Sequence, residues 1–541
     1  MIEVEGQTIG KRFNDSVRRY ASHPFLIVPR DPDRAYDRDG RMITFAEAGA
    51  AVDRYATLLS KAGYGYGHRI AVLLENRAEN LLVKLACAKL GVSWVPVNPD
   101  YRPSEIAFLL RDSDAELAIA TEARSELMAA GIRESGRSVP LSTFAPDIEV
   151  FAEARRPAPV SAPPHGLTEA SLLYTSGTTG RPKGCILNHE YELMLGAWYT
   201  DCGGLFKIEE ARERIYNPLP LFHVNAGIVS FYGALLTGNC QIIPERFGRT
   251  RWWPEIRETE ATMIHYLGVV VPVILNEPPS PDDRRHKVRF GFGAGLEPTV
   301  HGVFEERFGF PLIEGWGMTE MCRILTASVE PRHIDTRAMG RPRDGLQIRV
   351  VDAEDRDVPI GEPGEMVVRH SAESPRKGAF SGYLNQPEAT AEAWRNGWLH
   401  TGDTVRQDES GMLYFVDRKK NIIRRSGENI AAAEIEACLQ GLDRVAQVAV
   451  LAIEDPLRDE EVLACIVLKK GAPNTEQARA CFDHCYDNLA YYKAPGWIAF
   501  VDSLPVTGTQ KVLKHMIFAE GEDPLSRPNT FDFREFKKRR R

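Results

Sequence analysis

One segment constrains the fold of this chain more than any other: residues 174–184 (YTSGTTGRPKG), a run of glycines and hydroxyl side chains that contains one lysine. The glycines allow the backbone to turn tightly and to bring its N–H groups close to an anion. The hydroxyl groups add hydrogen-bond donors, and Lys183 adds a compact positive charge that suits a phosphate. Apolar residues 172–174 precede the run. The pattern therefore predicts a phosphate-binding loop at the end of a β-strand.

This loop differs from the Walker A pattern, which ends in Gly-Lys-Ser/Thr. Here Pro182 precedes the lysine and Gly184 follows it. A merely flexible polar loop would need neither the lysine nor the dense hydroxyl groups. The residues that we expect to contact phosphate are Thr175, Ser176, Gly177, Thr178, Thr179, Gly180 and Lys183.

The first third of the chain alternates helical and extended patterns. Residues 44–62 place apolar side chains on one helical face, and residues 79–90 form a second helical segment that ends at Gly91. Residues 70–74 and 92–97 are short apolar runs typical of buried strands. Strand, helix and strand at this spacing predict a parallel sheet and an α/β fold.

The pattern changes after about residue 340, where short strands are expected at residues 346–351, 364–369 and 412–415. A charged break at residues 417–420 follows, and then a fresh series of strands and helices. A chain of 541 residues is too long for one core. We therefore expect a large N-terminal domain with a β-rich subdomain (residues 1–416) and a small, mobile α+β domain (residues 417–541).

Composition excludes several classes of protein. Hydrophobic residues make up 43% of the chain and charged residues 26%, as in ordinary globular proteins. Lysine and arginine number 67 against 75 acidic residues, so the net charge of −8 disfavours nucleic-acid binding. No stretch approaches the roughly 18 apolar residues of a membrane span. The nine scattered cysteines predict reduced thiols and a cytoplasmic protein.

Two smaller features favour structural explanations. Cys481, His484 and Cys485 lack the paired ligand spacings of zinc sites, so we expect a helix face rather than a metal centre. The basic run at residues 537–541 is expected to be a solvated chain end. The sequence does not indicate the oligomeric state, and a homo-oligomer stays open.

Further motifs follow the loop in order: residues 220–225 (PLFHVN), 315–320 (GWGMTE), 398–403 (WLHTGD) and 505–514 (PVTGTQKVLK). Together they resemble the adenylate-forming superfamily of acyl-CoA synthetases, peptide-synthetase adenylation domains and luciferases. The resemblance covers roughly residues 13–517. Among acyl-CoA synthetases, the chain looks most similar to the carnitine/crotonobetaine-type ligases.

The resemblance implies an ATP-dependent acid–thiol ligase that forms an acyl-AMP with release of pyrophosphate, and then a CoA thioester with release of AMP. Its substrates and cofactors would be a carboxylic acid, ATP, Mg²⁺ and CoA. Two alternatives stay open: a free-standing adenylation enzyme that loads a carrier protein, and a catalytically silent nucleotide-binding relative.

The resemblance also implies roles for individual residues. Thr319 would donate to the α-phosphate, Glu320 would hold Mg²⁺, and Lys511 would be catalytic. Trp316 stands where the family usually has tyrosine, and Gln510 replaces the usual glycine before the lysine. The expected ATP-binding residues are the phosphate-loop residues named above together with Gly293, Ala294, Gly295, Glu314, Gly315, Trp316, Thr319, Asp403 and Arg418.

The remaining roles concern the acyl group and the thiol. His223 would gate the acyl pocket or touch the carboxylate, although a structural histidine is an alternative. Acetate-type relatives carry a tryptophan at the position of Gly317, so a glycine there predicts an acid larger than acetate. The expected acyl pocket comprises His223, Val224, Trp316, Gly317 and Met318, the expected CoA contacts are Gly427 and Glu428, and the expected hinge is Lys420.

Overall fold

A computed structural model of the chain describes residues 2–175, 182–268, 270–418, 421–425, 428–455, 458–489, 491–506 and 512–538. For residues 417, 418, 422, 424, 428, 429, 431, 459 and 515 only the backbone is described. The chain packs as two compact units. The first comprises residues 1–348 and 368–399, and the second comprises residues 349–367 and 400–541. The expected domain boundary near residue 416 stays a prediction.

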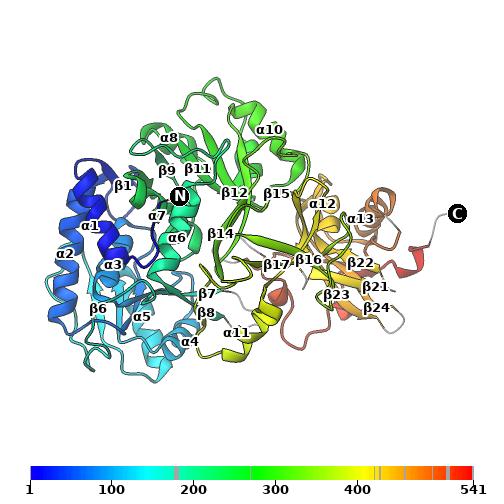
Figure 1. Cartoon of the computed structure of the whole chain (residues 1–541). Helices are drawn as coiled ribbons and strands as arrows, with labels where there is room; N and C mark the ends of the chain where they lie inside the picture. The colour runs from blue at the N-terminus through cyan, green and yellow to red at the C-terminus, as the bar shows by residue number, and fades with distance from the viewer. Residues whose placement is uncertain are drawn as a thin grey trace. The chain divides into compact units, whose positions relative to one another are not determined.

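The first unit is built on two large sheets (Figure 1). In the eight-stranded sheet the inner strands run parallel, and an antiparallel strand closes each edge. Its strands, in spatial order, are β14 (Met321–Thr326), β13 (Leu312–Met318), β12 (Phe290–Ala294), β11 (Met263–Leu267), β9 (Arg214–Tyr216), β10 (Cys240–Ile242), β1 (Pro24–Val28) and β2 (Arg41–Thr44).

The seven-stranded sheet combines a parallel part with an antiparallel part formed by β18, β8 and β7. Its strands, in spatial order, are β18 (Gly382–Tyr383), β8 (Lys183–Asn188), β7 (Glu169–Thr175), β4 (Ser93–Pro96), β3 (Arg69–Leu73), β5 (Leu117–Thr121) and β6 (Leu141–Phe144). A short strand, β15 (Ala338–Gly340), also belongs to this unit.

Helices cover both sheets, and the helices α1 to α3 pack against one another (Figure 1). The helices of the first unit are α1 (Ile9–Tyr20), α2 (Phe45–Lys61), α3 (Ala78–Leu90), α4 (Pro103–Ser113), α5 (Glu122–Ser135), α6 (His189–Thr200), α7 (Ser230–Thr237), α8 (Trp252–Glu258), α9 (Val270–Leu275), α10 (Pro298–Phe308) and α11 (Pro387–Ala393). A π-helical turn at Asn225–Val229 leads into α7.

Local sequence signals explain where several of these elements begin and end. Thr44 caps α2 through a reciprocal capping box with Glu47, and Gly91 ends α3 in the left-handed conformation, at φ 70°. The strands β3 and β4 are parallel neighbours. The predicted helices, strands and α/β fold class of the first third are thus confirmed.

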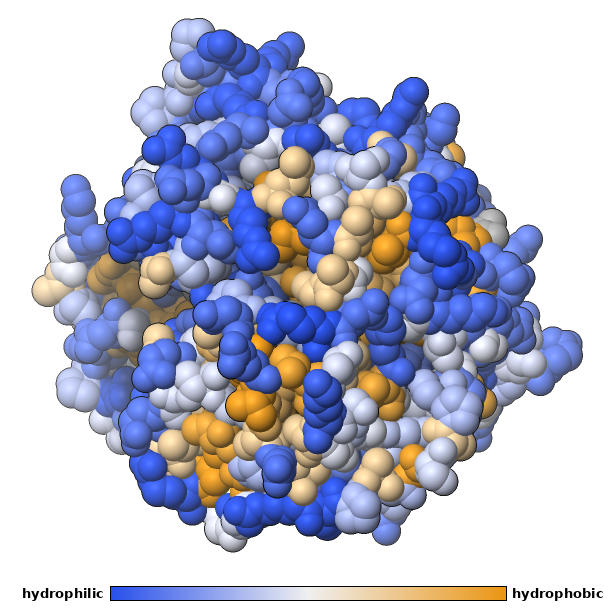
Figure 2. All heavy atoms as spheres, turned by 90° about the vertical axis from the view of Figure 1, so that its left-hand side faces the viewer, coloured by the Kyte–Doolittle hydropathy of each residue, from blue (hydrophilic) through white to orange (hydrophobic). Residues whose placement is uncertain are grey.

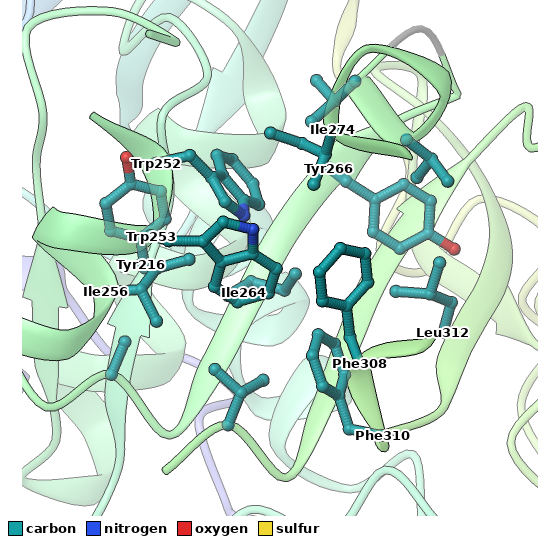
Figure 3. Packing of buried hydrophobic residues seen from close by; sticks show 14 of the residues in the cluster. Tyr216, Trp252, Trp253, Ile256, Ile264, Tyr266, Ile274, Phe308, Phe310 and Leu312 are labelled. Carbon is teal, nitrogen blue, oxygen red and sulfur yellow. The ribbon is translucent and has the colours of Figure 1, made fainter. Parts of the chain in front are cut away.

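An aromatic core supports the eight-stranded sheet (Figure 3). Trp252 and Trp253 of α8 pack with Phe308 of α10 against residues of the parallel strands, among them Ile264 and Tyr266. Aromatic side chains bury a large apolar area each, so this cluster fixes the strands from one face. The carboxyl ends of β11, β12 and β13 carry several of the predicted site residues, and the core therefore positions them.

Most residues of four strands belong to the second unit: β16 (Gln347–Val351), β17 (Gly364–Arg369), β19 (Leu399–Gln407) and β20 (Leu413–Arg418). These strands confirm the predicted β-rich segment. A further sheet follows, covered by α12 (Ala432–Gln440) and α13 (Thr475–Asn488). Its strands, in spatial order, are β22 (Glu428–Ala431), β21 (Ile422–Arg425), β24 (Asp459–Leu468), β25 (Trp497–Phe500) and β26 (Thr530–Asp532), and β23 (Val445–Asp455) also pairs with β24.

One expectation about the chain end is wrong. Lys537 is not solvated: its side chain is fully buried and pairs with the buried Glu461, which also pairs with Arg425 at 2.8 Å. Burial lowers the pKa of Lys537 to about 8, and the carboxylate of Glu461 opposes the shift. The buried carboxylate of Glu461 therefore binds the first lysine of the basic run. The sequence of the run itself does not indicate this ion pair.

All nine cysteines are free thiols. The ring of His484 lies 3.1 Å from the backbone oxygen of Cys438. In the described part of the chain, no helix combines the length and the apolar character that crossing a membrane requires. Figure 2 shows that hydrophilic residues cover much of one face of the molecule, with apolar residues in separate patches between them.

Candidate active site

The phosphate loop joins two antiparallel strands. Thr175 is the last residue of β7, Lys183 is the first residue of β8, and the two lie opposite each other in the register. The predicted position at a strand end is therefore confirmed. The loop residues Ser176, Gly177, Thr178, Thr179 and Gly180 lie outside the described residues.

Lys183 and Glu320, which are far apart in the sequence, contact the same tyrosine. The ammonium group of Lys183 lies 4.8 Å from the ring centre of Tyr383, and the Tyr383 hydroxyl donates a 2.7 Å hydrogen bond to Glu320 Oε1. Burial and the Glu320 carboxylate raise the pKa of Tyr383, so the phenol keeps its proton. Tyr383 thus brings the lysine of the loop and the predicted metal ligand to one place.

The turn that carries Thr319 and Glu320 is held from two sides. It connects β13 to β14, and Met318 pairs with Met321 across it. The Tyr191 hydroxyl of α6 donates to the backbone oxygen of Thr319 at 2.8 Å, and Phe380 N–H donates to that of Glu320 at 3.0 Å. These contacts fix the backbone of the turn, and the Thr319 side chain is half-buried.

The residues predicted to contact the adenine base lie on neighbouring parallel strands. Gly293 on β12 pairs with Tyr266 on β11 and with Glu314 on β13. A Cβ on Gly293 would lie 2.4 Å from the Tyr266 backbone oxygen, so only glycine fits there. Gly295 follows at φ 80°, in the left-handed region. In open α/β sheets, ligands bind at the carboxyl ends of such strands.

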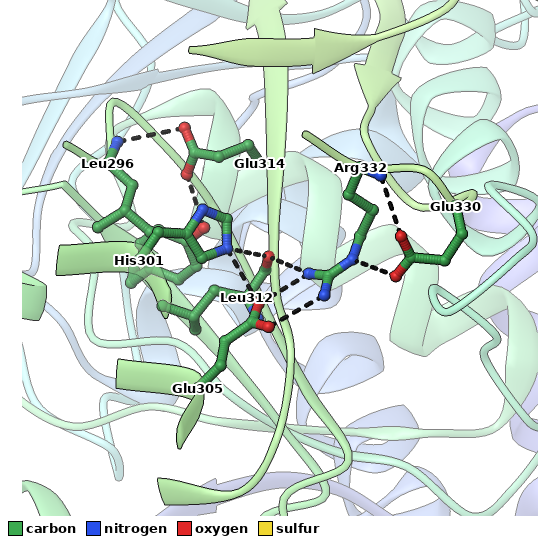
Figure 4. Close-up of polar contacts among 8 residues, drawn as sticks. Leu296, His301, Glu305, Leu312, Glu314, Glu330 and Arg332 are labelled. Carbon is green, nitrogen blue, oxygen red and sulfur yellow. Dashed lines mark hydrogen bonds and ion pairs between the residues drawn. The ribbon is translucent and has the colours of Figure 1, made fainter. Parts of the chain in front are cut away.

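Glu314 is a structural anchor at this edge (Figure 4). Its carboxylate accepts hydrogen bonds from the Tyr266 hydroxyl at 2.6 Å and from Leu296 N–H at 3.2 Å. Burial raises the pKa of Glu314, although these hydrogen bonds oppose the shift. The carboxylate therefore ties β11, β13 and the Gly295 turn together. The neighbouring residue Trp316 is almost fully buried.

A second carboxylate fixes the opposite end of β13 (Figure 4). Glu305 of α10 pairs with Arg332 at 2.7 and 3.0 Å, contacts His301 at 3.0 Å and accepts from Leu312 N–H at 2.8 Å. Burial alone would raise the pKa of Glu305, but the hydrogen bonds lower it to about 2. This network attaches α10 to the strand that carries Glu314.

The segment predicted to line the acyl pocket runs through an irregular turn. His223 N–H donates to Pro220 O, and the His223 backbone oxygen accepts from Gly227 N–H. Val224 leads into the π-helical turn, where a Cβ on Gly227 would lie 2.1 Å from Leu221 O. Such π-turns occur preferentially at functional sites. Gly317 is exposed on β13, next to Met318, and faces the Ile324 side chain.

Burial keeps the imidazoles of this region neutral. It lowers the pKa of His223 to about 4 and that of His265 to about 3. His265 Nδ1 lies 2.7 Å from Asn225 Oδ1, which also accepts from Asn217 at 2.9 Å. Nδ1 therefore carries the proton, and Nε2 accepts from the Tyr199 hydroxyl at 2.7 Å. The π-turn thus rests on a satisfied polar network.

The second unit carries the residues predicted to contact ribose. Asp403 on β19 is 1% exposed and lies opposite Arg418 on β20 in the register. The two predicted residues are therefore brought together, although only the backbone of Arg418 is described. Glu365 accepts from Gly402 N–H at 3.2 Å and lies 3.2 Å from His400 Nδ1, so it holds the turn that precedes Asp403.

Several predicted residues cannot be placed. Lys420, Gly427 and Lys511 lie outside the described residues, and for Glu428 only the backbone is described, at the start of β22. Among the described residues, no group of three or more histidine, cysteine or acidic side chains could hold a metal ion. A single carboxylate such as Glu320 nevertheless suits Mg²⁺, which commonly takes one or two carboxylates together with phosphate oxygens.

Sequence reasoning missed three contributors to the site, namely Tyr383, Glu365 and Lys84. Lys84 of α3 donates to Gly227 O at 2.8 Å and pairs with Glu192 at 3.0 Å. Each of the three lies outside the recognised motifs and acts on a residue distant in the sequence. Lys84 and Glu365 left one sequence signal, a polar side chain inside a largely apolar element. Tyr383 left none.

Comparison with known proteins places this geometry in a family. The family described as "AMP-binding enzyme" matches residues 13–384, and the family of the AMP-binding enzyme C-terminal domain matches residues 434–511. Crotonobetaine/carnitine–CoA ligase from Salmonella paratyphi A is 30% identical over 530 residues, which cover 94% of this chain and 99% of the relative. The ligase of the same name from Citrobacter koseri is 28% identical over the same shares.

Solved structures agree. The o-succinylbenzoate CoA synthetase from Bacillus subtilis, in complex with its acyl-adenylate intermediate, superposes with a TM-score of 0.80 at 27% identity, over 95% of this chain and 98% of that one. The same enzyme with ATP and magnesium ion gives a TM-score of 0.79. The predicted fold class, the resemblance and the enzyme class are confirmed. The chain belongs to the AMP-binding enzyme family and is an AMP-forming acyl-CoA synthetase by class.

Proposed function

We propose that this protein is an ATP-dependent carboxylic acid:CoA ligase whose acid is larger than acetate. A carboxylate oxygen attacks the α-phosphorus of ATP and pyrophosphate leaves. The thiol of CoA then attacks the acyl carbon and AMP leaves. The observation that carries the proposal is the contact of Lys183 and Glu320 with Tyr383, because it places a cation and a carboxylate together beside the phosphate-loop hairpin. The relatives named above are CoA ligases.

In the first step the chain holds ATP and offsets the charge on its phosphates. Lys183, Thr175 and the loop between them bind the outgoing phosphates, and Thr319 donates to the α-phosphate. Glu320 would hold Mg²⁺, which would supply charge neutralisation at the phosphate oxygens when bound. Residues 293–295 and 314–316 surround the base, and Asp403 and Arg418 bind the ribose hydroxyls, a role that carboxylates perform well. These roles rest on position within the family motifs.

The acid lies between the His223–Val224 segment and residues 316–318. A neutral His223 can donate one hydrogen bond to the carboxylate but brings no positive charge to it. Lys511 supplies that charge in the transition state of the first step. In the second step Gly427 and Glu428 border the path of the thiol arm, after a rotation about Lys420. Hinges of this kind are a few residues that absorb the change in backbone angles.

A panel of carboxylic acids scored by pyrophosphate release tests the proposal. The panel spans short, medium, aromatic and betaine-like acids, with and without CoA. We expect acid-dependent pyrophosphate release and, with CoA present, an acyl-CoA product from an acid larger than acetate. Adenylation without thioester formation from CoA would favour the carrier-protein loader. Nucleotide binding without pyrophosphate release from any acid would favour the silent relative.

A further inference from the structure

Arg323 is a buried cation that the proposed reaction does not use. It lies on β14, three residues after Glu320, and is 3% exposed. Its Nη1 donates to the backbone oxygen of Lys377 at 2.7 Å, and the sulfur atoms of Cys322 and Met194 each lie 3.3 Å from the guanidinium. The guanidinium also lies over the ring of Trp198, 5.4 Å from the ring centre. Its Nε is buried without a hydrogen-bond partner.

A guanidinium in this position lacks a counter-ion. Among the described residues, no carboxylate forms an ion pair with Arg323. Two weakly accepting sulfur atoms, one carbonyl oxygen and the face of the Trp198 ring do not replace an anionic partner, and a buried charge without such a partner is unfavourable. A sequence that keeps an arginine there is therefore expected to supply an anion from outside the chain.

A second unpartnered donor borders the same space. The Nδ1 atom of His370 is buried without a hydrogen-bond partner. A Cβ built on Gly345 would lie 3.8 Å from Arg323 Nε, 3.8 Å from the His370 ring and 3.5 Å from Trp198. All three are ordinary contact distances, so the three side chains surround a space that glycine leaves empty. Gly345 has a φ of 85°, which also favours glycine.

Gly345 and His370 also line a hollow of about 380 Å³, together with residues 342–344, 346 and 347 and Ser371. Because a water molecule takes up about 30 Å³, the hollow can hold a carboxylate or a phosphate group with its remaining hydration. We name it the Gly345 hollow. All of its lining residues belong to the first unit.

The lining of the Gly345 hollow carries one cation, Arg343, and one carboxylate, Asp344, and two further cations, Arg323 and Lys377, act on His370 of the lining. Arg343 stacks over Trp198 at 3.8 Å and lies 3.5 Å from Asp201, while Lys377 pairs with Glu5 at 2.8 Å. Within the described ranges of the chain, Arg323 has no such partner. Burial, Arg323 and Lys377 together lower the pKa of His370. A negative group in the hollow would interact favourably with all of these cations.

We propose that the Gly345 hollow binds an anionic oxygen group, a carboxylate or a phosphate, through Arg323 Nε and His370 Nδ1. The group could come from two sources: a second carboxylate on the acid that the enzyme activates, or a separate small anion. Arg323 and Ile324 are adjacent in a strand and so point to opposite faces. Ile324 faces Gly317 of the acyl motif, which favours the separate anion. Only the substrate source rests on the proposed function.

Thermal unfolding of the full chain tests binding directly. Succinate, sulfate or phosphate is titrated against chloride at constant ionic strength, and Tm is recorded, because a ligand of the native state stabilises it by mass action. We expect a saturable rise in Tm with at least one anion. Arg323→Met should abolish that rise. Arg356→Met makes the same change at an exposed arginine of the second unit and should leave it intact.

Two controls exclude anion binding at the nucleotide site and misfolding of Arg323→Met as causes of the result. Phosphate also fits the nucleotide site, so Lys183→Ala separates the two contributions. If Arg323→Met does not fold, His370→Gln takes its place in the Tm titration. In the unmodified protein labelled with ¹³C-histidine, the ring signal of His370 should shift when the anion is added. The proposal is overturned if no anion raises Tm above chloride, or if the rise persists unchanged in Arg323→Met and His370→Gln.

The source of the anion follows from a second measurement, pyrophosphate release with monocarboxylic and dicarboxylic acids. A loss in Arg323→Met that is confined to dicarboxylic acids assigns the group to the substrate. An unchanged acid preference, together with the lost rise in Tm, assigns it to a separate anion. If no acid releases pyrophosphate, the proposed function fails, while the Tm titration still decides whether the Gly345 hollow binds an anion.

Discussion

Tyr383 shows how one side chain can complete a site that sequence motifs describe only in part. Its ring contacts Lys183 and its hydroxyl contacts Glu320. The three residues come from β18, β8 and the turn after β13, and no local spacing connects them. Motif reasoning recovered the lysine and the glutamate, because each belongs to a recognisable run. It could not recover the tyrosine, which depends on the pairing of β18 with β8.

Tyr383→Phe tests this contact. The change removes the hydroxyl but keeps the ring against Lys183, so the Glu320 carboxylate loses one hydrogen bond. A hydrogen bond to a charged group is typically worth about 1.5–3 kcal/mol. We expect the Mg²⁺ concentration for half-maximal pyrophosphate release to rise about tenfold or more, with little change in Tm. Tyr414→Phe, which removes a tyrosine hydroxyl bonded to the half-buried Asp408, is the matched control. An unchanged Mg²⁺ dependence would separate Tyr383 from the metal site.

His223 is expected to stay neutral at physiological pH. Burial lowers its pKa to about 4, whereas in the unfolded chain it titrates near 6.5. Because the folded pKa is depressed, the contribution of this group to stability is present above pH 6.5 and is lost as the pH falls towards 4. Imidazole NMR of ¹³C-histidine-labelled protein, with His223→Gln to assign the signal, checks this. A midpoint near 6.5 would contradict it.

Gly317 is expected to set the size of the acid. A side chain there meets Ile324, whose Cγ2 lies 2.9 Å from the position of a Cβ. Gly317→Trp should therefore fill the pocket and shift preference towards two- and three-carbon acids, by a factor of about 10–200, the range that one methylene group typically gives. Ratios of kcat/KM across a chain-length series measure it. If the unmodified enzyme already prefers acetate, this interpretation is wrong.

At the scale of elements, prediction succeeded where the signals were local. Thr44 predicts the start of α2, and Gly91 predicts the end of α3. Glycines between short apolar runs predict the strands after residue 340. It failed where the cause lies far along the chain. The π-turn after His223 depends on the contact of Lys84 with Gly227, and the burial of Lys537 depends on Glu461.

Lys84 and Glu192 form a buried ion pair, and Lys84 also donates to Gly227 O in the π-turn. Their side chains are 1% and 0% exposed, and burial lowers the pKa of Lys84 while Glu192 opposes the shift. Lys84→Met leaves the carboxylate buried without its cation, so we expect a loss of about 3–5 kcal/mol of stability. Adding Glu192→Gln should restore part of it. Urea unfolding of the single and double variants measures this, and equal stability of Lys84→Met and the parent would contradict it.

At the scale of the whole molecule, the account needs the two half-reactions to use different arrangements of the chain. The expected pivot is Lys420, and proline fixes the φ angle. Lys420→Pro should therefore reduce thioester formation much more than adenylation. Lys419→Pro, one residue earlier, shows whether the effect belongs to that position. Equal losses in both half-reactions would count against a pivot at Lys420.

Substitution of Lys511 is expected to impair the first half-reaction and to spare the second, the opposite of Lys420→Pro. The attacking carboxylate and the α-phosphate are both anions, and an ammonium group between them offsets the charge that develops where water is excluded. Lys511→Ala should lower acyl-AMP formation by about 100- to 1000-fold, the usual cost of losing such a donor. Conversion of supplied acyl-AMP to acyl-CoA should be spared. Normal adenylation by Lys511→Ala would remove this residue from the mechanism, and Lys514→Ala, beside it, is the control.

The central claim is that the acid is activated as an acyl-adenylate, and the path of an oxygen atom tests it most directly. The preferred acid is labelled with ¹⁸O in its carboxylate and turned over with ATP, Mg²⁺ and CoA. If a carboxylate oxygen attacks the α-phosphorus, the AMP released in the thioester step carries one ¹⁸O atom, and pyrophosphate carries none. Unlabelled AMP, or ADP and phosphate in place of AMP and pyrophosphate, would contradict the account.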